Sequence, residues 1–239
     1  MSHAPIHIDP DAIDLEPLDL DPAAFQSPLP VQRYGLIFAD EAIGLAVGIW
    51  DTTTMQEAFG PYPGDEYITV LEGSFAMVDA AGRTLAAAQA GDSVTFRNGA
   101  PSSWKQDGYL RKVYLTLQDA GGAMPQITSA EGAFRVLDRS SVPQGSPDAD
   151  GVTREVTFFN DARTMTVTLC TFPTQSLQSA HGATHRLIRV LQGEITLTTP
   201  SAPPEPFYPG AHVFLPKGAA CTLAATAGTV AIMVDVTAP

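Results

Sequence analysis

Glu66 is the residue of this sequence whose type and setting point most directly to chemistry. In an alternating pattern it shares a strand face with Ile68 and Val70, which we expect to point into a core. A carboxylate among apolar side chains is unfavourable unless it is paired or protonated. The pattern therefore predicts that Glu66 is either a general acid or base or one half of a buried ion pair with Lys112 or Arg97.

Lys112 is an obvious partner for Glu66, but its own strand argues against that role. The apolar face of this strand is formed by Val113, Leu115 and Leu117, and strict alternation places Lys112 on the opposite face. A β-bulge could reverse the two faces. Without a bulge, we expect Lys112 to lie outside the pocket and Glu66 to lose this partner.

Two aromatic residues with polar tips, Tyr62 and Trp104, are candidates for the walls of a small-molecule site. Each has a simpler alternative. Trp104 could only cap the mouth of a barrel, and Tyr62 could pack under the N-terminal arm. The pocket is our preferred interpretation for Trp104.

Arg186 is the most unusual residue in the second half of the chain. It alternates with Ile188 and Val190, and an inward arginine without a local acid suggests an anionic ligand such as a carboxylate. The alternative is an ion pair with Asp235 or Glu194. Cys221 is expected to be an inert buried thiol, because no base stands in an obvious triad arrangement with it.

The structural elements that position these residues occur twice, as an internal repeat of the sequence indicates. Residues 45–73 match residues 165–193 at an offset of 120 without a gap, and one residue is then lost in the following loop. The matched pairs that carry the repeat are Val47 with Val167, Ile68 with Ile188, Gly73 with Gly193, Gly91 with Gly210, Val94 with Val213 and Gly99 with Gly218. Their order and near-constant spacing indicate one structural unit that occurs twice.

The period within each unit is two residues, and runs of β-branched and aromatic residues lie between turn-forming clusters. We therefore predict an all-β chain with two sandwiches or barrels of about 85 residues each. The predicted divisions are an acidic arm at 1–35, a first domain at 36–122, a linker at 123–152 and a second domain at 153–239. The arm is expected to lie as a strap over the first domain, with a partner-binding acidic tail as the alternative.

Composition excludes several function classes. With 13 Lys plus Arg against 26 Asp plus Glu, the net charge of −13 is unsuited to nucleic-acid binding. The 2 cysteines favour a reducing compartment, and neither a signal peptide nor a membrane span is visible in the sequence. We expect a soluble cytoplasmic protein with no membrane partner. Phosphate loops, nucleophile elbows and dinucleotide fingerprints are also missing from the sequence.

The glycine and acidic positions of the first half resemble the two sequence motifs of the cupin superfamily. The residues that carry this resemblance are Asp65-Glu66-Tyr67, Val70-Leu71-Glu72-Gly73, Gly91-Asp92 and Gly99. Residues 20–118 resemble in particular the ureidoglycine aminohydrolase-like and ethanolamine-utilisation-like cupins. The matching stretches are Leu20-Asp21-Pro22, Gly48-Ile49-Trp50-Asp51, Tyr62-Pro63-Gly64-Asp65-Glu66, Trp104 and Arg111-Lys112-Val113-Tyr114. The resemblance implies two tandem cupin jelly-roll β-barrels, a bicupin, and a shared pocket containing Glu66, Trp104 and Lys112.

Many cupins hold a divalent metal with two His and a Glu from the first motif and a His from the second. Here Glu66 matches the glutamate, whereas Arg97 and Ser102 stand at the second-motif proline and histidine positions. One carboxylate is a poor transition-metal site, so we expect the first barrel to be metal-free and no cofactor to be required.

In the second unit, Arg186 stands at the glutamate position. A zinc set of His181, His185 and Cys221, with His212 nearby in sequence, is a weaker alternative. Successive strand residues face opposite ways, so His185 and Arg186 cannot both point inward on a regular strand.

These observations predict a protein that binds a small polar, anionic metabolite in a metal-independent barrel pocket. The expected binding residues are Tyr62, Arg97, Ser102, Trp104 and Arg186. A metal-free enzyme of the isomerase, lyase or aminohydrolase type, with Glu66 and Lys112 as catalytic residues, is the first alternative. A structural or dimerisation role is the second, since an isologous homodimer is the default symmetric assembly.

Overall fold

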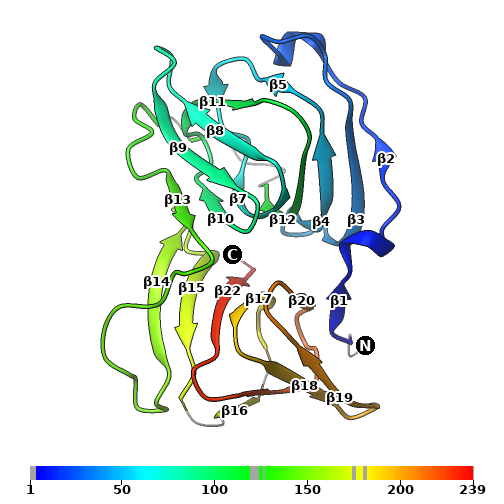
Figure 1. Ribbon diagram of the computed structural model, residues 1–239, viewed down its shortest axis with the longest axis vertical. Helices are drawn as coiled ribbons and strands as arrows, with labels where there is room; N and C mark the ends of the chain where they lie inside the picture. The colour runs from blue at the N-terminus through cyan, green and yellow to red at the C-terminus, as the bar shows by residue number, and fades with distance from the viewer. Residues whose placement is uncertain (1–3, 119–123, 126, 174–175, 180–181, 239) are drawn as a thin grey trace. The chain divides into compact units, whose positions relative to one another are not determined.

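Alternating apolar residues between glycine-rich turns form strands along most of the chain. The computed structural model describes residues 4–118, 124–125, 127–173, 176–179 and 182–238. They divide into two units, one of residues 10–139 and one of residues 1–9 with 140–239. Each unit consists of two antiparallel sheets, and we refer to them as the first and second barrel (Figure 1). The predicted all-β fold of two tandem jelly-roll barrels is confirmed.

The first barrel packs a seven-stranded sheet of order β13-β10-β7-β12-β4-β3-β2 with a second sheet of order β5-β11-β8-β9, in which β6 also pairs with β11. Its elements are η1 (Pro10–Ala12), β2 (Glu16–Pro17), η2 (Pro22–Ala24), β3 (Gln32–Asp40), β4 (Leu45–Thr52), β5 (Met55–Gln56), β6 (Gly60–Pro61), β7 (Asp65–Glu72), β8 (Ser74–Val78), β9 (Thr84–Gln89), β10 (Ser93–Phe96), β11 (Pro101–Gln106), β12 (Leu110–Leu117) and β13 (Phe134–Leu137).

The second barrel has sheets of order β1-β20-β17-β22-β15-β14 and β16-β21-β18-β19. Its elements are β1 (Ile6–Ile8), β14 (Thr153–Phe159), β15 (Met165–Thr171), β16 (Ser176–Ser179), β17 (His185–Gln192), β18 (Ile195–Thr199), β19 (Ala202–Phe207), β20 (His212–Leu215), β21 (Thr222–Ala225) and β22 (Val230–Val236). Among the described residues, no helix is long and apolar enough to cross a membrane.

The internal repeat of the sequence corresponds to equivalent strands. The order β10-β7-β12-β4-β3 in the first barrel is matched by β20-β17-β22-β15-β14 in the second. The repeated turn glycines also have the same left-handed backbone, with φ of 82° at Gly73 and 78° at Gly193. A Cβ at Gly73 would lie 2.2 Å from the carbonyl oxygen of Tyr109, so neither the backbone angle nor the space suits another residue. The repeat can be recognised in the sequence because these turns admit only glycine.

The predicted domain boundaries differ from the structure at three points. Ile6–Ile8 of the predicted arm form β1, which pairs with β20 of the second barrel (Figure 1). The first barrel begins before residue 36, because β3 starts at Gln32. The predicted linker contains β13, which pairs with β10 over Phe134–Leu137. Short strands at sheet edges carry a weak sequence signal, which explains these differences.

The rest of the arm is strapped onto the first barrel, as expected from the sequence. Its segment 24–27 is hydrogen-bonded to β5 and the residues that follow it, with Ala58 N donating to Ala24 O (2.8 Å) and Gln26 N donating to Gln56 O (2.8 Å). Phe25 forms an isolated β-bridge with Glu57 and packs against the core of the barrel. The strap therefore lies directly beside Glu57.

Candidate functional site

The interior of the first barrel contains an ion pair between Glu66 on β7 and Lys112 on β12. The ammonium of Lys112 lies 2.9 Å from Glu66 Oε1, and the hydroxyl of Tyr62 donates to Glu66 Oε2. The side chains of Glu66 and Lys112 are only 10% and 9% exposed. The expected interior position of Glu66 is confirmed, since Ile68 and Val70 on the same face belong to the buried core.

Lys112 lies inside the barrel, as its pairing with Glu66 requires, and the ladder of β12 with β7 has a register shift between Arg111 and Lys112. Lys112 pairs with Val70 across the ladder, and Tyr114 pairs with Ile68, so both share the interior face of β7. Val113 and Leu115 form the other face of β12, which is also fully buried. Because both faces of β12 are buried, the more apolar face does not identify the interior one.

Two tryptophans surround the ammonium of Lys112. Its Nζ lies 4.8 Å from the ring centre of Trp50 and 5.1 Å from that of Trp104, within the range of cation–π attraction. The indole of Trp104 stacks on Phe75 at 3.8 Å, and its Nε1 donates to Gln106 Oε1 at 2.8 Å. Trp104 is therefore a fixed wall of the interior. Trp50 was not among the predicted site residues, although it lies in one of the stretches that carry the cupin resemblance.

Tyr62 lies in the barrel core, stacked on Phe96 with ring centres 4.7 Å apart. Burial and the neighbouring Glu66 carboxylate raise the pKa of Tyr62 well above its usual value. The same two causes raise the pKa of Tyr114 to about 12. Both phenols are therefore neutral donors at neutral pH, and Tyr62 uses its proton to bind Glu66.

Glu57 is a further carboxyl at this site that the sequence reasoning missed. Burial raises the pKa of Glu57 to about 7, opposed by the charge of Lys112 and reinforced by that of Glu66. Its backbone N–H donates to the carbonyl of Trp104 at 2.9 Å. A signal existed in the sequence, because Glu57 alternates with the buried Met55, but β5 is too short for the period to stand out.

We use the term interior site for Glu57, Tyr62, Glu66 and Lys112 together with Trp50 and Trp104. Ser102 is buried near this set, where its hydroxyl donates to the carbonyl of Ala100 at 3.2 Å. Arg97 directly follows Phe96, the last residue of β10 and the ladder partner of Glu66. Ligand contacts by Ser102 and Arg97 stay predictions.

In the second barrel, Arg186 forms a two-pronged ion pair with Asp235. Its Nε and Nη2 donate to the two carboxylate oxygens at 2.7 and 3.0 Å. The two residues are direct ladder partners on β17 and β22. The alternative expected from the sequence, an ion pair of Arg186 with Asp235, is therefore the one present in the structure, and an anionic ligand at Arg186 stays a prediction. The alternation pattern of one strand could not reveal that partner.

The alternative zinc set of the second barrel is not assembled. His185 pairs with Val236 on the face opposite to Arg186, stacks on Phe214 and accepts the backbone N–H of Lys217 (3.1 Å). Cys221 lies in the apolar core with Ile188 and Val190, and burial raises the pKa of its thiol. His181 lies outside the described residues. Among the residues that the structure describes, no three His, Cys, Asp or Glu side chains are gathered as a metal site.

The other histidine considered there, His212, is also turned away from Cys221. It alternates on β20 with the core residues Val213 and Leu215, so it lies on the opposite face of the sheet. Burial and the charge of Arg189 lower the pKa of His212 to about 3. His212 is therefore a neutral, buried imidazole at every physiological pH.

The interior site of the first barrel does not fit a divalent cation either. A metal ion bound at Glu66 would have to displace the ammonium that lies 2.9 Å from Oε1. The remaining neighbours are phenol and indole groups, which are not the imidazole or multiple carboxylate ligands that transition metals require. We therefore derive no step through a metal at this site.

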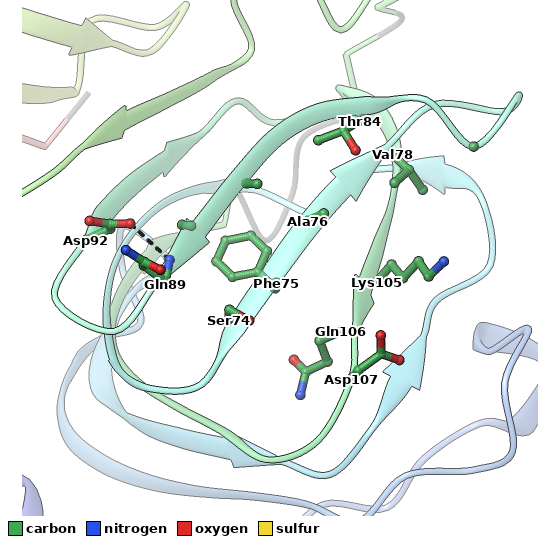
Figure 2. Close-up of a pocket in the computed structure, with 13 residues that line it drawn as sticks. Ser74, Phe75, Ala76, Val78, Thr84, Gln89, Asp92, Lys105, Gln106 and Asp107 are labelled. Atoms are coloured by element: carbon green, nitrogen blue, oxygen red, sulfur yellow. Dashed lines mark hydrogen bonds between the residues drawn. The ribbon is translucent and has the colours of Figure 1, made fainter.

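A separate surface groove of 570 Å³ lies over β8, β9 and β11 (Figure 2). Its outward-facing side chains are small or polar, as at Ala76, Thr84 and Lys105, and none of the predicted site residues lines it. The carboxylate of Asp92 accepts a hydrogen bond from the backbone N–H of Gln89 at 2.9 Å, which is the dashed line in Figure 2. This bond stabilises the turn after β9. Among the residues that line the groove, Gln106 is a buried polar side chain.

Residues 44–114, which include Trp50, Glu57, Tyr62, Glu66, Trp104 and Lys112, match the family model of the EutQ-like cupin domain. No curated protein matches the sequence. The fold is also that of solved structures with low sequence identity.

Three of these structures illustrate the degree of similarity. A protein of unknown function from Pseudomonas syringae pv. tomato, of the DUF861 family, has a TM-score of 0.70 at 21% identity, covering 98% of this chain and 99% of its own. A putative dioxygenase from Nostoc punctiforme has a TM-score of 0.67 at 10% identity, with 98% and 83% covered. HEPD from Streptomyces albus, solved with 2-hydroxyethylphosphonate and Fe(II), has a TM-score of 0.59 at 9% identity, with 98% and 76% covered. At these identities the likeness shows the fold alone.

Proposed function

We propose that the first barrel binds a small polar metabolite at the interior site, without a metal ion. The observation that carries this proposal is the buried Glu66–Lys112 pair inside an aromatic-walled barrel. Concave sites with apolar walls and a few fixed polar groups are the usual form of small-molecule sites.

Stability alone does not account for this pair. Taking two charges out of water has a desolvation penalty that often exceeds their attraction, so apolar residues of similar volume would stabilise a barrel at least as well. The tryptophans and Tyr62 also fix both charges in position. A rigid pair of opposite charges, with slight exposure remaining on each side chain, suits the recognition of a polar ligand.

Intrinsic fluorescence provides a specific test. The chain has only 2 tryptophans, and both contact Lys112, so their emission reports on this site. We expect at least one compound in a panel of small carboxylates, amines and ureides to change the emission and raise the melting temperature. A ligand at 100 times its Kd adds about 2.7 kcal/mol of stability.

The matched variants are Lys112→Met, which should abolish the response, and Lys105→Met, which removes an exposed lysine and should leave it intact. The proposal is wrong if no compound changes either signal, or if the Lys112→Met protein responds as the original does. Metal analysis belongs to the same test, because a stoichiometric cation bound at Glu66 would contradict metal independence.

A second candidate function is acid–base catalysis in the same barrel, of the isomerase, lyase or aminohydrolase type. Glu57 favours it, since a carboxyl with a pKa of about 7 can both take and give a proton at neutral pH. In this case Glu57 takes the role that the sequence suggested for Glu66, whose two oxygens are already bound. If a bound compound is converted, Glu57→Gln should abolish turnover even at substrate concentrations that saturate the variant; full activity in that variant would exclude the mechanism.

A further inference from the structure

The charges of the interior site do not balance. It contains the carboxyls of Glu57 and Glu66 but one ammonium, that of Lys112. Glu66 is bound by both Lys112 and Tyr62. Among the described residues Glu57 has no ion-pairing side chain, and its polar neighbour is the backbone N–H of Trp104. Glu57 is therefore the carboxyl of the interior site without an oppositely charged side chain of its own.

Phe25 of the strap lies beside Glu57. The two residues are β-bridge partners, and directly opposed residues in a ladder place their side chains on the same face. Phe25 and Trp50 are both partly buried and pack against the core of the barrel. Their rings can attract a cation in addition to the carboxyl of Glu57.

We propose that the ligand of the interior site carries a protonated primary amine, which binds between the carboxyl of Glu57 and the rings of Phe25 and Trp50. This inference rests on the proposed function, since it names the chemical class of ligand for the same site. It replaces the anionic ligand expected from the sequence, for which the main support was an unpaired Arg186.

Proton linkage distinguishes the two ligand classes by sign. The groups that act on Glu57 are Lys112, Glu66 and Tyr62, together with the backbone of Trp104. Burial holds the pKa of Glu57 at about 7, so this carboxyl is part-protonated in the free protein at neutral pH. An amine favours the ionised form and releases a proton on binding, so its affinity should rise as the pH rises. An anion favours the protonated form and should bind more tightly as the pH falls.

The experiment compares n-propylammonium, propionate and 1-propanol at constant ionic strength. These probes are similar in size and differ in charge. Tryptophan emission gives the affinity at pH 5.5 and at pH 8, and calorimetry in two buffers of different ionisation enthalpy gives the protons exchanged. We expect n-propylammonium to bind, with roughly tenfold or greater gain in affinity between these pH values and net proton release.

The variants are Glu57→Gln and, as a control, Glu72→Gln, which removes an exposed carboxyl on β7. Glu57→Gln should weaken n-propylammonium about tenfold or more at pH 8 and remove the pH dependence. The control should do neither.

Propionate binding that tightens at low pH would overturn the amine inference and leave the proposed function standing. If none of the probes or panel compounds changes the tryptophan emission, both the amine inference and the proposed function are wrong. If n-propylammonium binds Glu57→Gln as tightly as the original protein, the assignment to Glu57 is wrong.

Discussion

Lys112 and Glu66 show how a single pair of residues determines the chemistry of a barrel interior. The ammonium is held by a carboxylate and two indoles, and the carboxylate is held by the ammonium and a phenol. Each member makes the burial of the other tolerable. The pair acts as one unit, so changing either residue alone should have a large effect.

The first prediction concerns this unit. Lys112→Met should lower the free energy of unfolding by about 3–5 kcal/mol, because it leaves an uncompensated carboxylate in the barrel. Urea denaturation measures the change. The double variant Lys112→Met with Glu66→Leu should recover most of the loss, and Lys105→Met should have almost no effect. Equal losses in the single and double variants would contradict the pairing.

Glu57 gives the second prediction, a dependence of stability on pH. Its pKa is about 7 in the folded protein against an ordinary value of 4.5, so folding favours the protonated form. The resulting stabilisation is complete below pH 4.5 and is lost as the pH rises through about 7. Glu57→Gln should remove this loss, which amounts to about 1–3 kcal/mol.

Urea denaturation at pH 4.5 and pH 8 measures the effect, as the difference between the original protein and Glu57→Gln. The variant should be relatively more stable at pH 8. Two stability curves that stay parallel across this range would show that Glu57 has an ordinary environment.

At the scale of elements, the turns between strands fix the registers that bring these residues together. Gly73 joins β7 to β8 with a left-handed backbone, and the space beside its Cα is filled by the carbonyl of Tyr109. Since β7 carries Glu66 and the chain after Tyr109 is β12 with Lys112, this close approach lies at the end of the ladder that aligns the ion pair.

The third prediction compares two glycines with similar backbone angles. Gly73→Ala should destabilise the protein by several kcal/mol, because the new Cβ meets backbone at 2.2 Å. Gly82→Ala, at φ +77° with nothing within 4 Å, should lose only about 1 kcal/mol from the unfavourable backbone angle. Thermal or urea unfolding of the two variants measures the difference, and equal effects would exclude a steric role for the Tyr109 carbonyl.

At the scale of the whole molecule, the chain begins in one barrel and continues in the other. Ile6–Ile8 complete the edge of the second barrel by pairing with β20, and from Pro10 onward the chain belongs to the first barrel. Strand β1 is therefore part of a barrel whose next strand in the sequence begins only at Thr153. Such long-range pairing is slow to form and has little local signal.

The fourth prediction tests this edge strand. Ile8 is 2% exposed, so Ile8→Ala should lower the stability by about 2–5 kcal/mol. His7→Ala changes the half-exposed neighbour on the same strand and should have an effect below about 1 kcal/mol. Unfolding followed by circular dichroism measures both. A neutral Ile8→Ala variant would show that β1 is not required for the second barrel.

The sequence by itself determined the fold class, the repeat and the interior position of Glu66. These follow from local rules: a period of two for strands, and glycine where the backbone angle is positive. Such rules act over a few residues, so their patterns can be recognised from the amino-acid sequence alone.

Only the tertiary structure decided which charges meet. Lys112 lies on the face of β12 that is turned toward Glu66, and Arg186 is paired with Asp235 on a neighbouring strand. Glu57 directly follows the two-residue strand β5. The pairs Glu66–Lys112 and Arg186–Asp235 join residues that are 46 and 49 positions apart in the sequence. Coulomb interactions and desolvation depend on distance in space and on burial, and neither quantity is encoded in the periodicity of a single strand.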